Sequence, residues 1–153
     1  MSKVEEKLAA LGLTLPEPPA KGGLYSPAKI FGGKLVYISG CGDKIDGTEK
    51  DGKLGADLTT EEGYELAKKS MLNVLAVLKR EIGDLDNVKS CVKVTCFVSS
   101  APDFYQQPQV ANGGTQLLKD IFGEDVVPTR SAIGMAVLPG NLAVETEALF
   151  EIK

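Results

Sequence analysis

The C-terminal segment PTRSAIGMAVLPGNLAVETEALFEIK (128–153) places charged side chains among residues that favour β-strands. Arg130 stands near its start, and Glu145 and Glu147 follow toward its end. A guanidinium can hold a carboxylate through two parallel hydrogen bonds, and a glutamate can take a proton from an attacking water. The segment therefore contains groups that could bind a small carboxylic acid and activate water beside it.

The residues at 138–141, Leu-Pro-Gly-Asn, suit a type II turn with proline and glycine at its central positions. This turn predicts an antiparallel hairpin in which Ala132 lies opposite Glu147, Gly134 lies opposite Glu145, and Arg130 is diagonal to Glu147. One face would pack on the core and carry Ile133, Met135, Val137, Leu142, Val144, Ala148, Phe150 and Ile152. The other face would carry Arg130, Ala132, Gly134 and Ala136 beside Glu145, Glu147 and Glu151.

Two interpretations of the charged face stay open at this point. Small side chains beside an arginine leave room for a ligand whose carboxylate the guanidinium would hold. Alternatively, Arg130 only pairs with Glu147 and the small residues fit against another subunit, because ion pairs across strands are common. Either way, this face predicts a ligand site or an interface.

Composition limits the chemistry and the partners. The chain has 153 residues, 43% of them hydrophobic and 25% charged, which suits one globular domain. A net charge of −4 without basic runs argues against a nucleic-acid partner. The sequence contains no histidine, which excludes Ser-His-Asp and Cys-His catalysis and most zinc sites.

The N-terminus and the cysteines bear on location. No apolar stretch approaches the ~20 residues that span a bilayer, and residues 1–13 lack the apolar core of a signal peptide. Cys41, Cys91 and Cys96 are odd in number and lack metal-ligand spacing. We therefore expect reduced thiols in a cytoplasmic protein that binds no membrane. Beside Gly40, Cys41 could face a cleft, but a buried and unreactive thiol is the favoured interpretation.

The elements can be placed from capping and periodicity. Ser2 with Glu5 and Thr59 with Glu62 form capping boxes that open helices. We expect an N-terminal helix and proline-rich extension over 1–20, then one domain over 21–153. The domain's elements would be strands at 24–31 and 35–40, a helix at 59–82, a strand at 88–100, a helix at 112–122, and the two closing strands. The order β-β-α-β-α-β-β predicts an α+β sandwich, one sheet with two helices on one face.

The strand at 88–100 alternates in polarity. Its core face is predicted to carry Val92, Val94, Cys96 and Val98, and Cys96 is expected to be a packing residue.

Several short motifs together resemble the Rid family, the reactive intermediate deaminases also known as YjgF. They are Arg130-Ser131, Leu138-Pro139, VETEA at 144–148, Tyr25 in GGLYSPA, Ser39-Gly40 in LVYISG, the helix segment NVLAVL and the strand VKVTCFV. The resemblance covers roughly residues 24 to 152. TRSAIG together with PQVANGG resembles the chorismate-mutase-like branch.

The resemblance implies a chorismate-mutase-like fold assembled as a homotrimer. The sheets would line a barrel-like centre, and three ligand sites would lie in the clefts between subunits. Deaminases of this family hydrolyse 2-enamine and 2-imino acids, such as 2-aminoacrylate and 2-iminopropanoate, to 2-keto acids and ammonia. The resemblance implies no metal and no organic cofactor.

The resemblance also assigns roles to individual residues. Arg130 matches the arginine that grips the substrate carboxylate, and Glu145 matches the glutamate that activates water. Gly40 matches a glycine whose backbone contacts the ligand, with Ser39 beside it. Tyr25 would line the pocket. Ala132 stands where the deaminases often have cysteine, in a contact commonly made through the backbone.

Other functions remain as alternatives. The chain could be a trimer that binds small carboxylates without turning them over, as a sensor or accessory protein. A chorismate-mutase-type reaction normally needs several cationic groups, and the closing segment offers Arg130. Ribonuclease activity, attached to some relatives, fits poorly with an acidic chain that lacks histidine.

Overall fold

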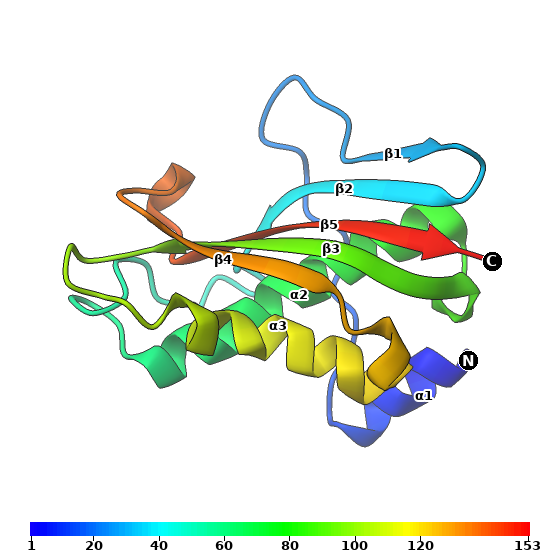
Figure 1. The fold of residues 1–153 in the computed structure, drawn as a ribbon, viewed down its shortest axis with the longest axis horizontal. Coiled ribbons are helices and arrows are strands. Elements are labelled where there is room, and N and C mark those ends of the chain that lie inside the picture. Colours follow the sequence, from blue (N-terminus) through cyan, green and yellow to red (C-terminus); the bar gives the residue numbers. More distant parts are fainter.

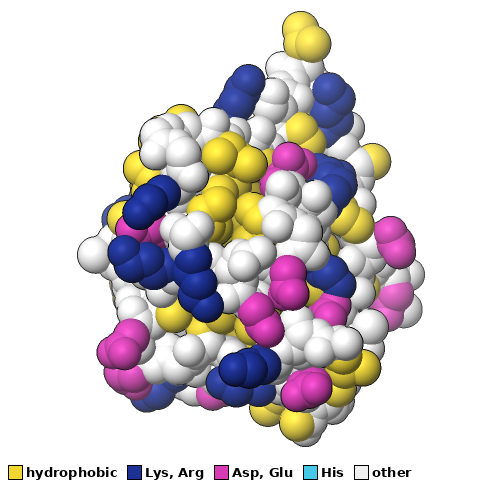
Figure 2. Space-filling model, turned by 90° about the vertical axis from the view of Figure 1, so that its right-hand side faces the viewer, with side chains coloured by type: hydrophobic (Ala, Val, Ile, Leu, Met, Phe, Trp, Pro, Cys, Tyr) yellow, Lys and Arg dark blue, Asp and Glu magenta, His cyan; other side chains and the backbone are white.

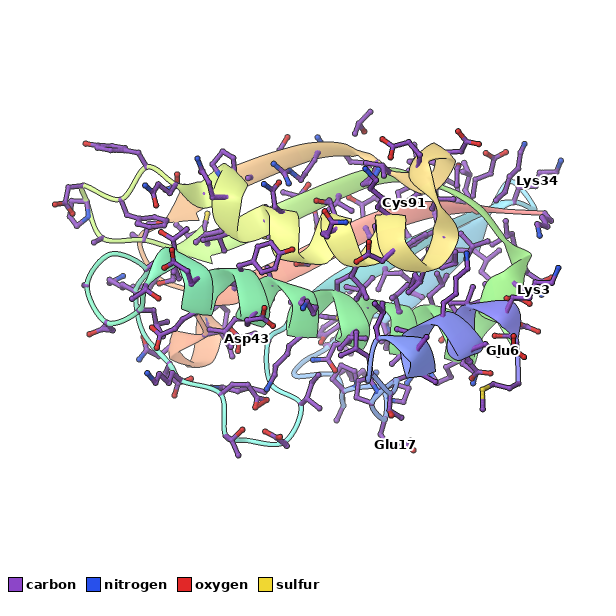
Figure 3. The ribbon with its side chains drawn as sticks, turned by 90° about the horizontal axis from the view of Figure 1, so that it is seen from below. Lys3, Glu6, Glu17, Lys34, Asp43 and Cys91 are labelled. Atoms are coloured by element: carbon purple, nitrogen blue, oxygen red, sulfur yellow. The ribbon has the colours of Figure 1, made fainter.

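The computed structural model describes residues 1–153 as a helical layer packed on one face of a single sheet (Figures 1 and 3). In chain order the elements are α1 (Lys3–Ala10), β1 (Ala28–Phe31), β2 (Leu35–Gly42), α2 (Thr60–Ile82), η1 (Leu85–Asn87), β3 (Val88–Ser99), α3 (Gln107–Phe122), η2 (Glu124–Val126), β4 (Thr129–Met135), η3 (Pro139–Asn141) and β5 (Val144–Ile152). The predicted α+β class and the β-β-α-β-α-β-β order are confirmed. None of the helices has the length and apolarity required to traverse a membrane.

The sheet does not contain the predicted closing hairpin. Its order is β1-β2-β5-β3-β4, with β5 antiparallel to both β2 and β3, and β4 parallel to β3. The predicted turn does form, since the Asn141 N–H donates to the Leu138 carbonyl at 3.1 Å and Gly140 has a φ of 65°. However, β3 separates the two strands that the turn joins. The reason is that β3, α3 and β4 form a crossover unit, which returns the chain parallel to β3.

The parallel pairing of β4 reverses the predicted faces of that strand. Arg130 pairs with Val94 and Ala132 pairs with Cys96. Both β3 residues are buried beneath the helices, so Arg130 and Ala132 also point toward the helical layer. Ile133, predicted in the core, is 41% exposed on the open face. The predicted proximity of Arg130 to Glu147 is therefore wrong.

Other predicted core positions have mixed outcomes. Val144, Ala148 and Phe150 of β5 are buried as predicted, whereas Val137 is 71% exposed. In β3 the residues Val94, Cys96 and Val98 are buried, but Val92 is 38% exposed. An irregularity of pairing between Cys91 and Lys93 shifts the alternation there, as a β-bulge does.

Both predicted capping boxes are confirmed. The Ser2 hydroxyl accepts the Glu5 N–H, and the Thr59 hydroxyl accepts the Glu62 N–H, each at 3.2 Å. The second of these opens α2, which ends before Gly83 as predicted. The helix α3 begins at Gln107 rather than at 112. Pro108 is compatible with its first turn, because the N–H groups of that turn have no acceptor within the helix and proline lacks only this group.

The main core lies between the helices and the sheet. It joins Met71, Leu75 and Leu78 of α2 with side chains from α3 and from the strands β2, β3 and β5, and it includes Val4 and Leu8 of α1. Asp86 fixes α1 to this body, since its carboxylate accepts the Lys3 and Val4 N–H groups at 2.9 and 3.0 Å.

Buried polar groups hold the ends of β2 and β5 together. The Asp43 side chain, wholly buried, accepts the N–H groups of Ala143 and Val144 at 3.2 and 2.9 Å. The Asn73 amide of α2 donates to the carbonyls of Gly42 and Lys44 at 3.0 and 2.8 Å. These bonds fix the position of the strand ends that carry the groups described below.

Glycine allows α2 and α3 to approach closely. A Cβ built on Gly113 would lie 1.9 Å from the Tyr64 carbonyl oxygen, a backbone atom of the facing helix. A Cβ on the adjacent Gly114 would lie 3.3 Å or more from its neighbours.

We expect Gly113→Ala to destabilise the protein by about 3 kcal/mol, because the two helices must separate. Gly114→Ala is the matched control, and its effect should stay within about 1 kcal/mol because alanine favours a helix over glycine. Urea unfolding followed by circular dichroism measures both. Equal midpoints for the two variants would contradict the proposed close packing at Gly113.

Candidate functional site

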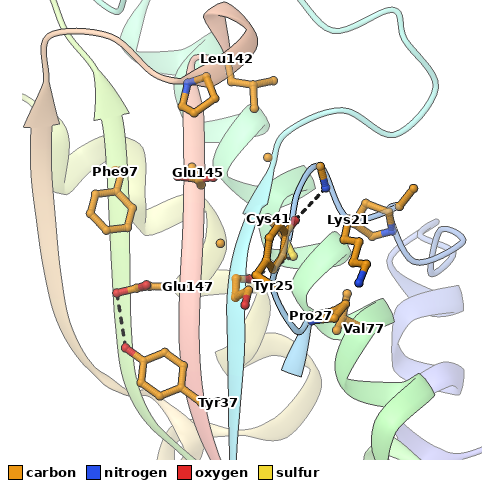
Figure 4. Close-up of a pocket in the computed structure, with 17 residues that line it drawn as sticks. Lys21, Tyr25, Pro27, Tyr37, Cys41, Val77, Phe97, Leu142, Glu145 and Glu147 are labelled. Atoms are coloured by element: carbon orange, nitrogen blue, oxygen red, sulfur yellow. Dashed lines mark hydrogen bonds between the residues drawn. The ribbon is translucent and has the colours of Figure 1, made fainter. Parts of the chain in front are cut away.

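A cavity of about 650 Å³ opens where β2 and β5 run side by side (Figure 4). Four of the residues predicted from the sequence line it: Tyr25, Ser39, Gly40 and Glu145. Its lining also includes Tyr37, Phe97, Glu147, Leu142 and the segment 19–22. None of the residues 43–58 or 101–114 lines it. The cavity thus brings together most of the predicted site residues.

Glu145 lies directly over Gly40. A Cβ built on Gly40 would lie 2.9 Å from Cδ of Glu145 and 3.0 Å from its Oε1. The pairing of β2 with β5 is irregular between Ile38 and Cys41, which is where Gly40 stands. The bulge and the absence of a side chain on Gly40 leave room for the Glu145 carboxylate to lie against the Gly40 backbone.

The environment of Glu145 favours its protonated form. Burial raises the pKa of this carboxyl above its ordinary value, and the negative charge of Glu147 raises it further. A carboxyl shifted in this direction can exchange a proton nearer to neutral pH than an exposed glutamate can. Glu145 therefore has the electrostatic character of a general acid or base.

Glu147 has a partner on β2. The Tyr37 hydroxyl donates to Oε1 of Glu147 at 3.5 Å (Figure 4). Burial, followed by the nearby Glu147 charge, raises the pKa of Tyr37. The phenol thus keeps its proton and remains a hydrogen-bond donor to Glu147. Glu145, Glu147 and Tyr37 form a connected group of titratable side chains on the open face of the sheet.

Hydrogen bonds of the segment before β1 hold Tyr25 at the cavity. The Gly22 N–H donates to the Tyr25 hydroxyl at 3.0 Å, and the Ser39 hydroxyl donates to the Ser26 carbonyl at 2.7 Å. The segment projects from the body of the molecule, and Figure 2 shows an apolar side chain at the tip of that projection. Leu24 of this segment is fully exposed.

Arg130 does not line the cavity. Its guanidinium points to α3, where Nη1 donates to the Asn112 Oδ1 at 2.7 Å and to the Thr115 Oγ1 at 3.2 Å. Nη2 donates to the Pro108 carbonyl at 3.4 Å. These acceptors are all neutral, and no carboxylate forms a salt bridge with Arg130. The arginine is thus held in place while its charge remains uncompensated.

Ala132 also lies away from the cavity. It is partly buried and packs against the smaller hydrophobic cluster, which includes Val98, Val110 and Val144. Within one chain, the structure therefore separates Arg130 and Ala132 from the other predicted site residues. The strand β3 lies between them and Glu145.

All three cysteines are buried, which was expected for Cys41 and Cys96. Burial raises the pKa of Cys41 and of Cys91 to about 12 and that of Cys96 to about 11. Cys41 lines the cavity but is 5% exposed, so its thiol stays protonated at neutral pH. No cluster of three or more His, Cys, Asp or Glu side chains is arranged to hold a metal ion.

Sequence reasoning missed the roles of Tyr37, Phe97 and the α3 residues that hold Arg130. Tyr37 could have been found, because residues two apart in a strand share a face and Tyr37 precedes Ser39 by two positions in β2. Phe97 could not, because it meets Glu145 only through the pairing of β3 with β5, which joins segments that are distant in the sequence. Asn112 and Thr115 lie within the predicted helix, but the predicted hairpin turns Arg130 away from the helices, so their contact with it did not follow from the sequence.

Comparisons with known proteins support one family. A family model described as "YjgF/chorismate_mutase-like, putative endoribonuclease" matches residues 5–150. Protein TCP17 of Trypanosoma cruzi is 40% identical over 98% of this chain and 94% of its own length. The crystal structure of Atu1372 from Agrobacterium tumefaciens, a protein of unknown function, has 35% identity and a TM-score of 0.91 over 99% of this chain and 93% of its own.

A more distant solved structure shares the fold. E. coli TdcF with bound serine has 24% identity and a TM-score of 0.62, over 92% of this chain and 96% of its own. The resemblance seen in the sequence motifs is confirmed by the family model and by the relatives of higher identity. The chain belongs to the YjgF family, also called the Rid family.

Proposed function

We propose that this protein hydrolyses reactive 2-imino and 2-enamine acids to 2-keto acids and ammonia. The observation that carries the proposal is Glu145, a half-buried carboxyl of raised pKa that lies over Gly40 in an open cavity. Membership of the YjgF family supports the same activity. E. coli TdcF, with serine bound, supports a small amino-acid-like ligand for this fold.

The chemistry needs one oriented water and one proton carrier. Ionised Glu145 takes a proton as the water oxygen forms a bond to the electrophilic imine carbon, and the C=N π electrons move to nitrogen. The protonated glutamate then returns its proton to the nitrogen of the carbinolamine. Glu145 next takes the hydroxyl proton of the carbinolamine as the C=O bond of the 2-keto acid forms and the C–N bond breaks. The departing nitrogen receives this proton and leaves as ammonia, so that Glu145 is ionised again. A positioned general base of this kind contributes roughly 100- to 10,000-fold in rate.

Arg130 joins this site from a second copy of the chain. Within one chain, β3 separates β4 from β5, and Arg130 points to the helical face while Glu145 points to the open face. Arg130 lies on the edge strand β4, and its guanidinium is held only by neutral acceptors of α3. Such a cation is suited to bind a carboxylate that lies outside its own chain. A homotrimer, with Arg130 of one subunit facing the Glu145 cavity of the next, would unite the two groups in three equivalent clefts.

The first prediction concerns turnover. An amino-acid oxidase acting on alanine generates 2-iminopropanoate, and semicarbazide traps the imine that remains. Added wild-type protein should suppress the trapped product, whereas Arg130→Ala and Glu145→Gln should each lower kcat/KM by at least about 100-fold. Unchanged trapping with wild-type protein across several amino acids would contradict the enzymatic function, and a thermal shift with pyruvate would then favour binding without turnover.

The second prediction concerns the shared site. Arg130→Ala and Glu145→Gln chains are each expected to be inactive, but unfolding them together and refolding them as a mixture should restore activity. About one quarter of the clefts would then combine an intact arginine with an intact glutamate, since each position is filled at random. If the refolded mixture is no more active than the separate variants, the two residues do not meet across subunits.

The third prediction concerns pH. Glu145 must be ionised to accept a proton from water, so kcat/KM should fall as the pH drops through its raised pKa. Glu147→Gln removes the neighbouring negative charge, lowers the pKa of Glu145 and should move this acid limb to lower pH. Glu151→Gln, on the same face of β5 but paired with Lys89 at 3.0 Å, is the control and should leave the limb unmoved. A pH profile with identical limbs in all three proteins would exclude this coupling.

A further inference from the structure

The cavity beside Glu145 is larger than the smallest imino acids require. Its volume of about 650 Å³ falls within the range of roughly 300–1,000 Å³ typical of sites for drug-sized ligands. In a single chain, a three-carbon acid that presents its imine carbon to Glu145 would fill only part of this space, and the remainder is available to a larger side chain beside the arginine of the neighbouring copy. The side chains that line the rest of the cavity determine which ligand side chains fit there.

Aromatic and aliphatic side chains surround the two glutamates. Figure 4 shows Phe97 beside Glu145, Tyr37 beyond Glu147, Tyr25 across β2 and Leu142 at the end of the cavity. Tyr25 is 43% exposed and Tyr37 is 42% exposed, so much of each ring lacks an apolar partner within the chain. Rings held in this way gain from covering an apolar or aromatic group of a ligand.

The charges of the cavity oppose an acidic side chain on the ligand. Glu145 and Glu147 lie at the reacting centre, so a second carboxylate nearby would meet like charge. The remaining charged residue of the lining, Lys21, is exposed and lies on the opposite side of Tyr25 from both glutamates (Figure 4). Its ammonium group therefore does not balance an added negative charge beside Glu145.

We infer that this cavity selects 2-imino acids whose side chain is aromatic or long and apolar, over those that carry only a methyl group. The inference rests on the proposed function for the reaction at Glu145 and adds the class of substrate. The α-carboxylate points to the arginine of the neighbouring copy, the imine carbon lies at Glu145, and the side chain covers Phe97 and the tyrosine rings. Transfer of such a side chain from water to an apolar wall is worth about tenfold to a hundredfold in specificity.

Two measurements on the wild-type protein test this selection. The imines of phenylalanine, leucine and alanine are generated by an amino-acid oxidase, and kcat/KM is obtained from suppression of the semicarbazide-trapped product. The kcat/KM for the phenylalanine imine should exceed that for the alanine imine by about tenfold or more. Binding is measured separately by calorimetry with phenylpyruvate and pyruvate, the stable product acids, and phenylpyruvate should bind about tenfold or more tightly.

Variants assign the preference to the cavity wall. Phe97→Ala should reduce the ratio between the phenylalanine and alanine imines by at least about fivefold, and Phe97→Leu should reduce it less, because leucine retains apolar area. Tyr105→Ala is the control, because Tyr105 is 79% exposed and lies outside the cavity. Circular dichroism establishes that each variant is folded.

The outcomes separate this inference from the proposed function. Equal kcat/KM values and equal affinities for the large and small compounds overturn the selection while the hydrolysis stands. A ratio that survives Phe97→Ala unchanged in the folded variant overturns the assigned wall. Tight phenylpyruvate binding without hydrolysis of any imine supports the selectivity of the cavity and overturns the reaction. If the protein neither binds the product acids nor hydrolyses any imine, both the selectivity and the proposed reaction are overturned.

Discussion

The insertion of β5 between β2 and β3 is the constraint on which the rest of the structure depends. As the central strand it buries Val144, Ala148 and Phe150 against the helices, and it presents Glu145 and Glu147 on the opposite face. Because β5 pairs with β2, Glu145 lies over the bare backbone of Gly40. Because it also pairs with β3, Phe97 becomes the neighbour of Glu145. The strand β5 thus packs on the hydrophobic core with one face and positions the glutamates of the candidate site on the other.

Local signals predicted local structure well. The capping boxes at Ser2 and Thr59 and the glycine after α2 describe interactions between residues a few positions apart, so the sequence alone defines them. The closing turn was also local, and it forms. The pairing of the strands on either side of it depends on a competition with β3, a distant segment, and the turn carries no information about that competition. The helix between β3 and β4 was the better guide, because such crossovers return strands in parallel.

The site shows the same division between local and distant information. Residues matched by the family resemblance, Tyr25, Ser39, Gly40 and Glu145, do meet in one cavity. The alternation of residues in the closing segment predicts Arg130 beside Glu147, whereas the structure places Arg130 against α3. The residue type was informative, since the guanidinium lacks a counter-ion. The direction in which Arg130 points depends on the pairing of β4 with β3, a segment that is distant in the sequence.

The burial of all three cysteines has a consequence if the protein hydrolyses electrophilic imines as proposed. Imines and conjugated enamines react with thiolates, and the reactive species is the ionised sulfur rather than the thiol. With the pKa of Cys41 and Cys91 near 12 and that of Cys96 near 11, almost none of these sulfur atoms is ionised in neutral solution. Cys41 can therefore stand at the wall of the cavity without becoming a target for covalent modification. The fold protects its own sulfur atoms from the compounds that it is proposed to destroy.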